Sequence, residues 1–334
     1  MSARDTIHLA IAAINNSIYL KFLKRCDITT SAAKFHMLGQ KEYRIGAYNA
    51  FKGGYKDYSP TAERTRFKAL VTAITYLHPD ALGVSDSNGW DRDFTPHELA
   101  SAFDFKDSAS VPLLDPRLQE LGHDNGVSLL TNFEIVEARP VQLVTRQALL
   151  ATVKVDKKLL DIAVVYFDDI HESLREDQAE ALVQALSLDR PTLIMGDLNT
   201  FNAKDFRFTR YVGSYLRRSF PRIAATFLPQ IRERVKGNTL RYLESQSFVD
   251  AGETNPQPTT PTPLLKVRPL PGGVIEVPLM PLFRLDYILY RGGIIVSPVK
   301  RHSGGIFDRA SDHYPITAQL KINETSSGLI YPAE

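Results

Sequence analysis

Between Val127 and Phe167 the sequence consists of short apolar runs separated by tight polar turns, and this feature limits the possible folds more than any other. Apolar runs of this length, bounded by such turns, are typical of strands. The pattern returns at Thr192–Met195, an apolar run that leads directly into Gly196-Asp197-Leu198-Asn199. The sequence therefore predicts a sheet-rich domain with strands at 43–48, 80–84, 127–130, 134–137, 148–155, 159–167, 192–195, 285–290, 293–296 and 314–321.

Two amphipathic helices between these strands indicate how the sheets are covered. The first is expected to begin at Ser59, a suitable N-cap, with Pro60 in its first turn, and to end before Pro79. The second is expected over Glu172–Leu188. Strand pairs with helices between them favour an α+β fold, namely a four-layered α/β/β/α sandwich of two mostly antiparallel sheets flanked by helices.

No linker in the sequence cleanly divides the chain into two domains. We expect an N-terminal helical extension at residues 1–40, one main domain at 41–325 and a tail at 326–334. A basic helical insert is expected within the main domain at about 203–245, followed by a Pro/Thr-rich loop at 256–263.

Composition excludes several classes of protein. Of the 334 residues, 43% are apolar and 23% charged, which is ordinary globular usage. No apolar run reaches the roughly 18–20 residues of a membrane-spanning helix, and the segment after Arg4 lacks the pattern of a signal peptide. The only cysteine, Cys26, excludes an internal disulfide framework and a cysteine-built metal site. We therefore expect a cytoplasmic monomer without a transmembrane segment.

The net charge of +2 conceals a strongly basic segment. The segment from Lys204 to Arg241 contains ten Lys or Arg residues and only two acidic residues, Asp205 and Glu233. Its net charge is therefore +8, and the rest of the chain carries −6. A basic insert on an acidic body favours an anionic partner. Aromatic residues among the arginines are compatible with nucleic acid, with a phosphorylated lipid or small phosphoester, or simply with an amphipathic helix whose arginines face water.

Acidic and amide side chains recur where the expected strands end. A rigid sheet positions groups at strand ends while the adjoining loop leaves them open to a substrate. Carboxylates with few histidines and no cysteine suit a hard cation such as Mg²⁺ or Mn²⁺. Together they could hold a cation, activate water and stabilise charge on a phosphoryl group. The residues are Asn49, Asp86, Asp197, Asn199, Asp286 and Asp312, with His313 beside the last.

Three motifs in order carry a family resemblance. Gly196–Asn199 (GDLN) after an apolar strand, Arg284–Ile288 (RLDYI) and Ser311–Ile316 (SDHYPI) resemble the signatures of the endonuclease/exonuclease/phosphatase superfamily, whose members include deoxyribonuclease I-like enzymes, apurinic/apyrimidinic endonucleases, inositol polyphosphate 5-phosphatases and bacterial sphingomyelinases. The resemblance runs from about Tyr43 to Ile322 and makes the main domain a catalytic one. The Arg-rich insert and Pro-Thr-Thr-Pro stretch look like a bacterial subgroup whose substrate the resemblance does not supply.

The resemblance implies a role for each matching residue. Asp197 resembles the residue that activates or orients the attacking water, and Asn199 the one that holds a phosphate oxygen. His313 resembles the imidazole that contacts the scissile phosphate, with Asp286 as its orienting carboxylate. A carboxylate on one ring nitrogen fixes the tautomer and raises the pKa of the other, which gives this pairing a physical basis.

The implied metal site is less regular. Asp312 resembles a metal-linked carboxylate, and Asn49 stands where the family uses an Asn near metal and phosphate. Where members usually have a metal-binding Glu this chain has Asp86, one methylene shorter, so the metal shifts, a water intervenes, or Asp91 or Asp93 takes over.

A second departure follows the strand at 159–167, where many members place a His. Here the chain offers Tyr166 and, later, His171. A Tyr resembles the apurinic/apyrimidinic endonuclease arrangement, in which the phenol contacts the phosphate, although a core aromatic is an equal alternative. His171 is expected to be a surface residue at the start of a helix.

These implications lead to one preferred function and two alternatives. The preferred one is divalent-metal-dependent hydrolysis of a phosphodiester by water, in a nuclease. A phosphomonoesterase or phospholipase of the same fold is the second. A catalytically silent module that binds anionic polymers through the insert is the third.

Overall fold

Residues 41–59, 61–202, 229, 231–267, 277–278 and 281–322 are described by the computed structural model. The expected N-terminal extension (1–40), the tail (326–334) and residues 203–228 of the expected basic insert lie outside the described residues. The fold and the site are therefore those of the main domain.

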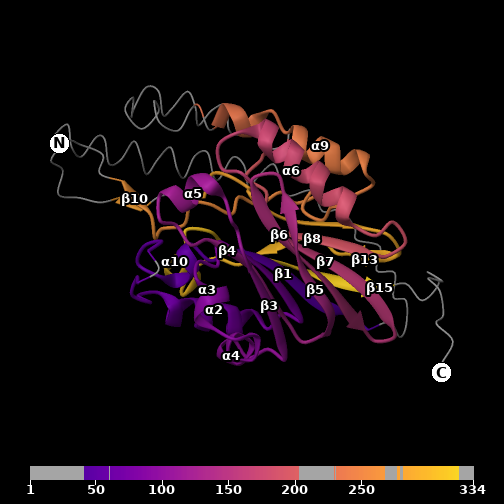
Figure 1. Cartoon of the computed structure of the whole chain (residues 1–334), viewed down its shortest axis with the longest axis horizontal. Helices are drawn as coiled ribbons and strands as arrows, with labels where there is room; N and C mark the ends of the chain where they lie inside the picture. The colour runs from indigo at the N-terminus through magenta and orange to yellow at the C-terminus, as the bar shows by residue number, and fades with distance from the viewer. Residues whose placement is uncertain are drawn as a thin grey trace, which may run out of the picture. The chain divides into compact units, whose positions relative to one another are not determined.

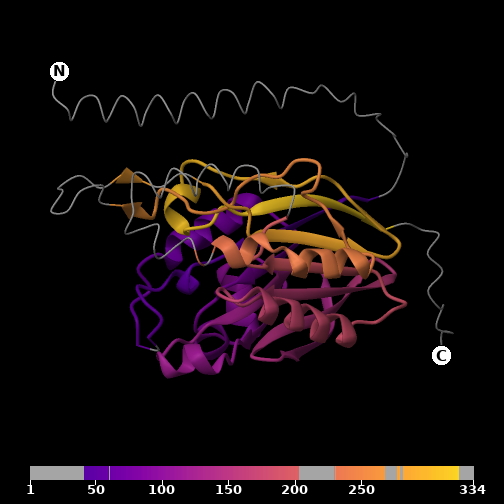
Figure 2. The ribbon, with the colours of Figure 1, turned by 90° about the horizontal axis from the view of Figure 1, so that it is seen from above.

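A seven-stranded mixed sheet pairs the N-terminal part of this domain with its C-terminal part. The first described strand lies between the last one, to which it is antiparallel, and its own successor, to which it is parallel. Figure 2 shows the yellow C-terminal strands against the indigo N-terminal part. The strand order is β13 (Ile294–Val296), β15 (Ile316–Ile322), β1 (Tyr43–Asn49), β2 (Ala81–Ser85), β4 (Gly126–Thr131) and β3 (Asp107–Pro112), with β14 (Lys300–Arg301) paired to β15.

A six-stranded mixed sheet is built mainly from the middle of the chain. Only β7 and β8 are parallel within it, and α6 connects them. The strand order is β5 (Glu134–Leu143), β6 (Arg146–Val155), β7 (Lys158–Tyr166), β8 (Thr192–Asp197), β12 (Asp286–Arg291) and β9 (Val249–Asp250). A separate two-stranded ribbon joins β10 (Lys266–Val267) to β11 (Val277–Pro278).

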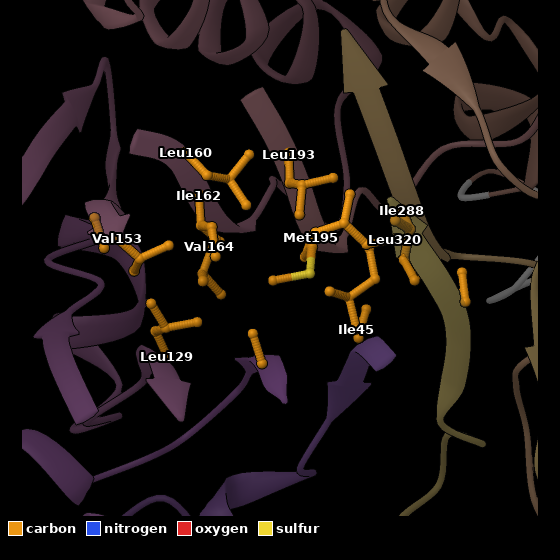
Figure 3. Close-up of a cluster of buried hydrophobic side chains, with 14 of the residues drawn as sticks. Ile45, Leu129, Val153, Leu160, Ile162, Val164, Leu193, Met195, Ile288 and Leu320 are labelled. Atoms are coloured by element: carbon orange, nitrogen blue, oxygen red, sulfur yellow. The ribbon is translucent and has the colours of Figure 1, made fainter. Parts of the chain in front are cut away.

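The main core lies between the two sheets. Alternate residues of a strand point to the same face, so the longer strands of both sheets each contribute a set of apolar side chains to this layer. At Gly83 the sheets come so close that a Cβ would lie 2.9 Å from the Cβ of Met195. Figure 3 shows part of this core, with Ile45, Leu129, Val153, Leu160, Ile162, Val164, Leu193, Met195, Ile288 and Leu320 labelled.

Helices cover the outer faces of both sheets (Figure 1). The outer apolar residues of the seven-stranded sheet, among them Leu82, pack against Leu70 and Trp90. Those of the six-stranded sheet, among them Val165, pack against Leu182 of α6 and Leu243 of α9. The helices are α2 (Phe67–Leu77), α3 (Trp90–Asp93), α4 (Pro96–Ala102), α5 (Pro116–Glu120), α6 (Glu172–Ala185), α9 (Asn238–Ser245) and α10 (Phe307–Ala310), with the short 3-10 turn η1 (Lys52–Gly54).

The predicted sandwich is confirmed: two mixed sheets are packed face to face and flanked by helices. Ten predicted strands correspond to β1, β2, β4, β5, β6, β7, β8, β12, β13 and β15. In the described part of the chain, no helix combines the length and the apolar character that crossing a membrane requires.

The start of the first helix was predicted wrongly. The helix begins at Phe67, not at Ser59. The preceding segment folds back on itself through a hydrogen bond from the Lys56 N–H to the Glu63 carbonyl, so its backbone groups are satisfied without a helix. The Arg66 guanidinium donates to the carbonyls of Phe51 and Tyr55 and holds this loop beside η1.

Strand β3 was missed because its sequence, DSASVP, has no apolar run. It is the edge strand of its sheet, where Pro112 is tolerated because one side needs no ladder bonds. A cross-strand contact between the Ser110 and Ser128 hydroxyls, 2.7 Å apart, takes the place of apolar packing on one face.

Candidate active site

Strand register brings the expected polar residues to one end of the two sheets. Asp197, at the end of β8, lies beside Tyr166 at the end of β7 and opposite Asp286 at the start of β12. In the other sheet, Asn49 at the end of β1 lies beside Ser85 at the end of β2. Rigid strands thus set the spacing of these side chains, while the following loops determine what can reach them.

Asp197 connects the two sheets through its carboxylate. Asn49 Nδ2 donates to Asp197 Oδ2 at 3.0 Å, and the backbone N–H of Asn199 donates to Oδ1 at 2.8 Å. Burial raises the pKa of Asp197 to about 7, with His313 opposing the shift and Asp286 adding to it. A carboxyl group with a pKa near neutrality can both lose and accept a proton, as a general base must.

Ser85 braces Asp197 from the opposite sheet. Its Oγ accepts the Asp197 backbone N–H at 2.9 Å and donates to the Val165 carbonyl at 2.8 Å. Gly196 makes this approach possible, because a Cβ there would collide with the Val165 carbonyl and lie 2.8 Å from Ser85 Oγ. Its φ of +141° also favours glycine. We call Ser85, Val165 and Gly196 the rim seam.

His313 and Asp286 form a buried pair. Nδ1 of the imidazole lies 2.7 Å from Asp286 Oδ2, and Nε2 lies 4.0 Å from Asp197 Oδ2. Burial alone lowers the pKa of His313, but the charge and hydrogen bond of Asp286, with Asp312 and Asp197, outweigh it and raise the pKa to about 10. At neutral pH His313 is therefore an imidazolium whose Nε2–H faces the carboxylate of Asp197.

Asn199 holds a constrained conformation beside Asp197. Its φ is +50°, in the left-handed region that Asn tolerates better than most residues. Nδ2 donates to the Phe167 carbonyl at 3.1 Å, and Oδ1 accepts from Arg234 Nη2 at 2.9 Å. Among the residues that the structure describes, the second N–H of the amide has no acceptor and can therefore donate to another group.

Tyr166 is half-buried and packs as a core aromatic, one of the two alternatives considered for it. Its ring packs against the core between the sheets, and the Arg146 guanidinium lies over it, 5.2 Å from the ring centroid. Burial, with the charges of Asp86, Tyr58 and Asp197, raises the pKa of its hydroxyl well above the usual value. The phenol stays protonated and can donate a hydrogen bond.

Asp86 is buried and tightly held by its own neighbours. Oδ1 accepts from Asn125 Nδ2 at 2.8 Å, while Oδ2 accepts from the Lys52 backbone N–H at 3.0 Å and from the Tyr58 hydroxyl at 3.1 Å. Burial raises the pKa of Asp86 to about 6; the Lys52 hydrogen bond opposes this shift and the charge of Asp312 adds to it. We call Lys52, Tyr58 and Asn125 the Asp86 clamp.

Asp312 adjoins the cluster from the loop before β15. Burial raises the pKa of its carboxyl group, an effect opposed by His313 and Arg66. Next to it, the Ser311 hydroxyl donates to the Asn49 carbonyl at 2.6 Å and so ties this loop to the end of β1.

The other candidates lie elsewhere or have other partners. Asp93 accepts hydrogen bonds from Tyr55 and Arg92. Asp91 is half-buried in the first turn of α3. His171 is exposed at the N-cap of α6.

The Pro/Thr-rich loop proves to be a support for the site that sequence reasoning did not recognise. Thr259 Oγ1 accepts the backbone N–H groups of Leu285 and Asp286, at 3.2 and 3.4 Å. Thr260 Oγ1 donates to the Asp312 carbonyl at 2.9 Å. These threonines bind main chain from distant segments, and nothing in their own sequence context signals that.

A divalent cation fits the chemistry of this region. The charge of Asp312 raises the pKa of Asp86, and the charge of Asp286 raises the pKa of both Asp197 and Asp312, so four carboxyl groups lie in this region, a donor set of the kind that Mg²⁺ and Mn²⁺ prefer. Among the described residues, Asp286 Oδ1 and Asn125 Oδ1 are buried and have no hydrogen-bond partner, so both oxygens can still accept. Within the described residues, the group whose ligand atoms all lie within 4.8 Å of one another is Asp197, Asp286 and His313, and it does not include Asp86 or Asp312. His313 Nδ1 already pairs with Asp286 Oδ2, so Nε2 is the ring nitrogen that it could offer to a metal.

Comparisons with solved structures show the same fold. The endonuclease/exonuclease/phosphatase protein of Bacteroides vulgatus is 14% identical, with a TM-score of 0.54 over 85% of this chain and 100% of its own. The human Nocturnin catalytic domain with bound sulfate anion is 16% identical, with a TM-score of 0.54 over 84% of this chain and 95% of its own. The Beutenbergia cavernae endonuclease/exonuclease/phosphatase is 16% identical, with a TM-score of 0.54 over 85% of this chain and 72% of its own.

A search of the curated proteins gave no match. The sequence profile of the Endonuclease/Exonuclease/phosphatase family matches residues 46–313, well over half of the chain and the whole span from β1 to His313. Members of this superfamily are hydrolases that include nucleases, phosphatases and phosphodiesterases, and they commonly use divalent metals. With its motifs, its two packed sheets and its family profile in agreement, this chain belongs to the endonuclease/exonuclease/phosphatase family.

Proposed function

We propose that the protein is a divalent-metal-dependent phosphodiesterase that hydrolyses its substrate by direct attack of water. One observation carries the proposal: Asn49, Asp197, Asp286 and His313, which come from separate segments of the chain, form one buried cluster at the end of the two sheets. The cluster pairs a carboxyl group of near-neutral pKa with an imidazolium 4.0 Å away. The carboxyl group can activate water, and the imidazolium can bind the phosphate.

In the proposed reaction Asp197 is the general base. The water oxygen forms a bond to phosphorus as its proton passes to the Asp197 carboxylate, and the bond from phosphorus to the leaving oxygen breaks. The leaving alkoxide takes a proton from solvent. His313 donates from Nε2 to a non-bridging phosphate oxygen and offsets the charge that develops there. The free amide N–H of Asn199 and the phenol of Tyr166 are further donors to the phosphate.

We assign the metal to Asp86, Asp312 and Asn49. When bound, a Mg²⁺ or Mn²⁺ ion neutralises phosphate charge and acts as a Lewis acid. Asn49 would then serve both the metal and Asp197, because its Nδ2 already donates to that carboxylate. Asp86 Oδ2 already accepts two hydrogen bonds, whereas Oδ1 accepts one and keeps a lone pair, so a direct ligand through Oδ1 or a water-bridged one is chemically reasonable.

Among phosphodiesters we favour nucleic acid. The support is the +8 charge of Lys204–Arg241 and the aromatic residues interleaved with its arginines. The single cysteine, Cys26, supports a reducing compartment such as the cytoplasm.

The test is a comparison of substrates with one purified preparation. Plasmid DNA, RNA, abasic duplex, sphingomyelin and inositol phosphates are incubated with Mn²⁺ or Mg²⁺, with and without EDTA. Metal-dependent cleavage of a nucleic acid supports the proposal, and cleavage of a lipid or an inositol phosphate alone replaces the substrate class. Salt-sensitive binding of nucleic acid without any cleavage would identify a silent binding module instead.

A further inference from the structure

The basic insert of the sequence reaches the active site at its C-terminal end. Residues 231–235 are helical and precede α9. The Phe201 backbone N–H donates to the Arg234 carbonyl at 3.0 Å, and the Glu172 backbone N–H donates to Glu233 Oε2 at 3.3 Å. This helical turn is therefore fixed both to the loop that follows β8 and to the first turn of α6.

Arg234 forms several hydrogen bonds with the loop that contains Asn199. Its Nε donates to the Asn199 carbonyl at 3.1 Å, and its Nη2 donates both to Asn199 Oδ1 at 2.9 Å and to the Asp169 carbonyl at 3.0 Å. One guanidinium thus holds the main chain and the side chain of the same residue. A planar guanidinium, unlike an ammonium group, presents its donors in a rigid fork suited to such a grip.

These contacts determine which way the Asn199 amide faces. A guanidinium can only donate, so Arg234 requires the Asn199 Oδ1 on its own side. A carbonyl can only accept, so the Phe167 carbonyl, 3.1 Å from Nδ2, requires the amino group on the other side. Without Arg234 the amide could turn over, and an acceptor would then face the phosphate where a donor is needed.

We propose that Arg234 is a positioning residue, supplied by the basic insert, which fixes the Asn199 amide so that one Nδ2–H is held for the substrate phosphate. This inference rests on the proposed phosphodiesterase function. It gives the insert a role inside the site, separate from any docking of a polymer on its surface. The charge of Asp197 also acts on the Arg234 guanidinium, in keeping with a place close to the reacting groups.

The test is a double-variant cycle on bis(p-nitrophenyl) phosphate with Mn²⁺. Arg234→Met is expected to lower kcat about 100-fold with little change in KM, because a misplaced group costs rate more than binding. Asn199→Ala should show a similar loss, and the double variant should be no slower than Asn199→Ala alone. Losses that multiply, or an Arg234→Met enzyme with wild-type kcat, would overturn the proposal.

Arg291→Met is the matched control. Arg291 is also half-buried and donates to a main-chain carbonyl, that of Ser187, but at the far end of β12 from Asp286. It should lose stability without losing kcat. If Arg234→Met does not fold, Arg234→Lys replaces it in the cycle, because it keeps the charge and the stem but not the fork.

A wild-type protein inert towards every phosphoester would refute the proposed function, and the role of Arg234 would still be decided by NMR. The side-chain amide signals of Asn199 are assigned from their absence in Asn199→Ala. In Arg234→Met they are expected to shift and broaden. Unchanged signals would refute the positioning role whatever the activity.

Discussion

The two halves of the site differ in what holds them. In the proposed hydrolytic half, Asp197 and Asp286 come from the six-stranded sheet and His313 comes from the loop before β15; the three are partners of one another and agree with the family motifs. On the seven-stranded sheet, Asp86 departs from the motif and is held by the clamp of Lys52, Tyr58 and Asn125, which comes from loops around it. The proposed hydrolytic half therefore depends on the register of β8 and β12 and on the Asp286–His313 pair, whereas the proposed metal half depends on local loops.

The largest effect is expected from the hydrolytic half. Asp197→Ala should lower kcat by about 10³-fold, because general-base catalysis typically contributes 10²–10⁴-fold, and raising the Mn²⁺ concentration should not restore it. Asp161→Asn is the control, since Asp161 is also a buried carboxylate of the same sheet but lies at the opposite end of β7. Recovery of turnover at high Mn²⁺ would place Asp197 in the metal half and break the comparison.

Asp286→Asn is expected to lower activity about 100-fold and to change its pH dependence. Asp286 helps to raise the pKa of His313 to about 10, so its neutralisation should lower that pKa by about 1–3 units. The variant would then lose the imidazolium, and with it activity, at pH 8–9, where the wild type keeps both. A pH–rate profile of kcat measures this; an unchanged alkaline limb would mean that His313 acts in its neutral form.

Asp86→Asn should act on metal affinity more than on turnover. We expect the dissociation constant for Mn²⁺, measured by calorimetry, to rise about 10–100-fold, with kcat largely recovered at saturating metal. Asp80→Asn serves as the control, because Asp80 lies at the other end of β2 and accepts from the Arg44 backbone N–H. If metal affinity stays the same, Asp91 or Asp93 becomes the leading candidate for a ligand.

The smallest effect is expected from the clamp itself. Tyr58→Phe removes one donor from Asp86 Oδ2 and should weaken Mn²⁺ binding about 10-fold, because hydrogen bonds to a ligating carboxylate orient it. The hydrolytic half should be unaffected, so kcat at saturating Mn²⁺ should match that of the wild type. Tighter Mn²⁺ binding in this variant would show that the tyrosine competes with the metal.

Sequence predicted the fold best where one physical signal dominates. The apolar run Thr192–Met195 is buried on both faces, so it could be predicted as a strand from hydrophobicity alone. The segment 59–66 was misjudged because its Ser-Pro start is a helix signal, whereas the loop is held by contacts of Arg66 with residues distant in sequence. Local patterns contain no information about such partners.

The same division applies to the site. The residues carried by motifs, Asp197, Asp286 and His313, were identified from sequence and lie together. Ser85, Thr259 and Arg234 were not identified, because each acts by bonding a main-chain or amide group from another segment. Serine, threonine and arginine are common in loops and at strand ends, so only the structure distinguishes these three from the others.

The rim seam has a consequence for how this scaffold can change. The Ser85 hydroxyl of one sheet bonds the main chain of the other, and only a glycine at position 196 leaves room for this contact. The separation of the two sheets is therefore set at the end of β8, beside Asp197. In the proposed reaction the position of the Asp197 carboxylate is then set by the two sheets and not by the loops around it, so a side chain at position 196 is expected to slow hydrolysis of every substrate alike.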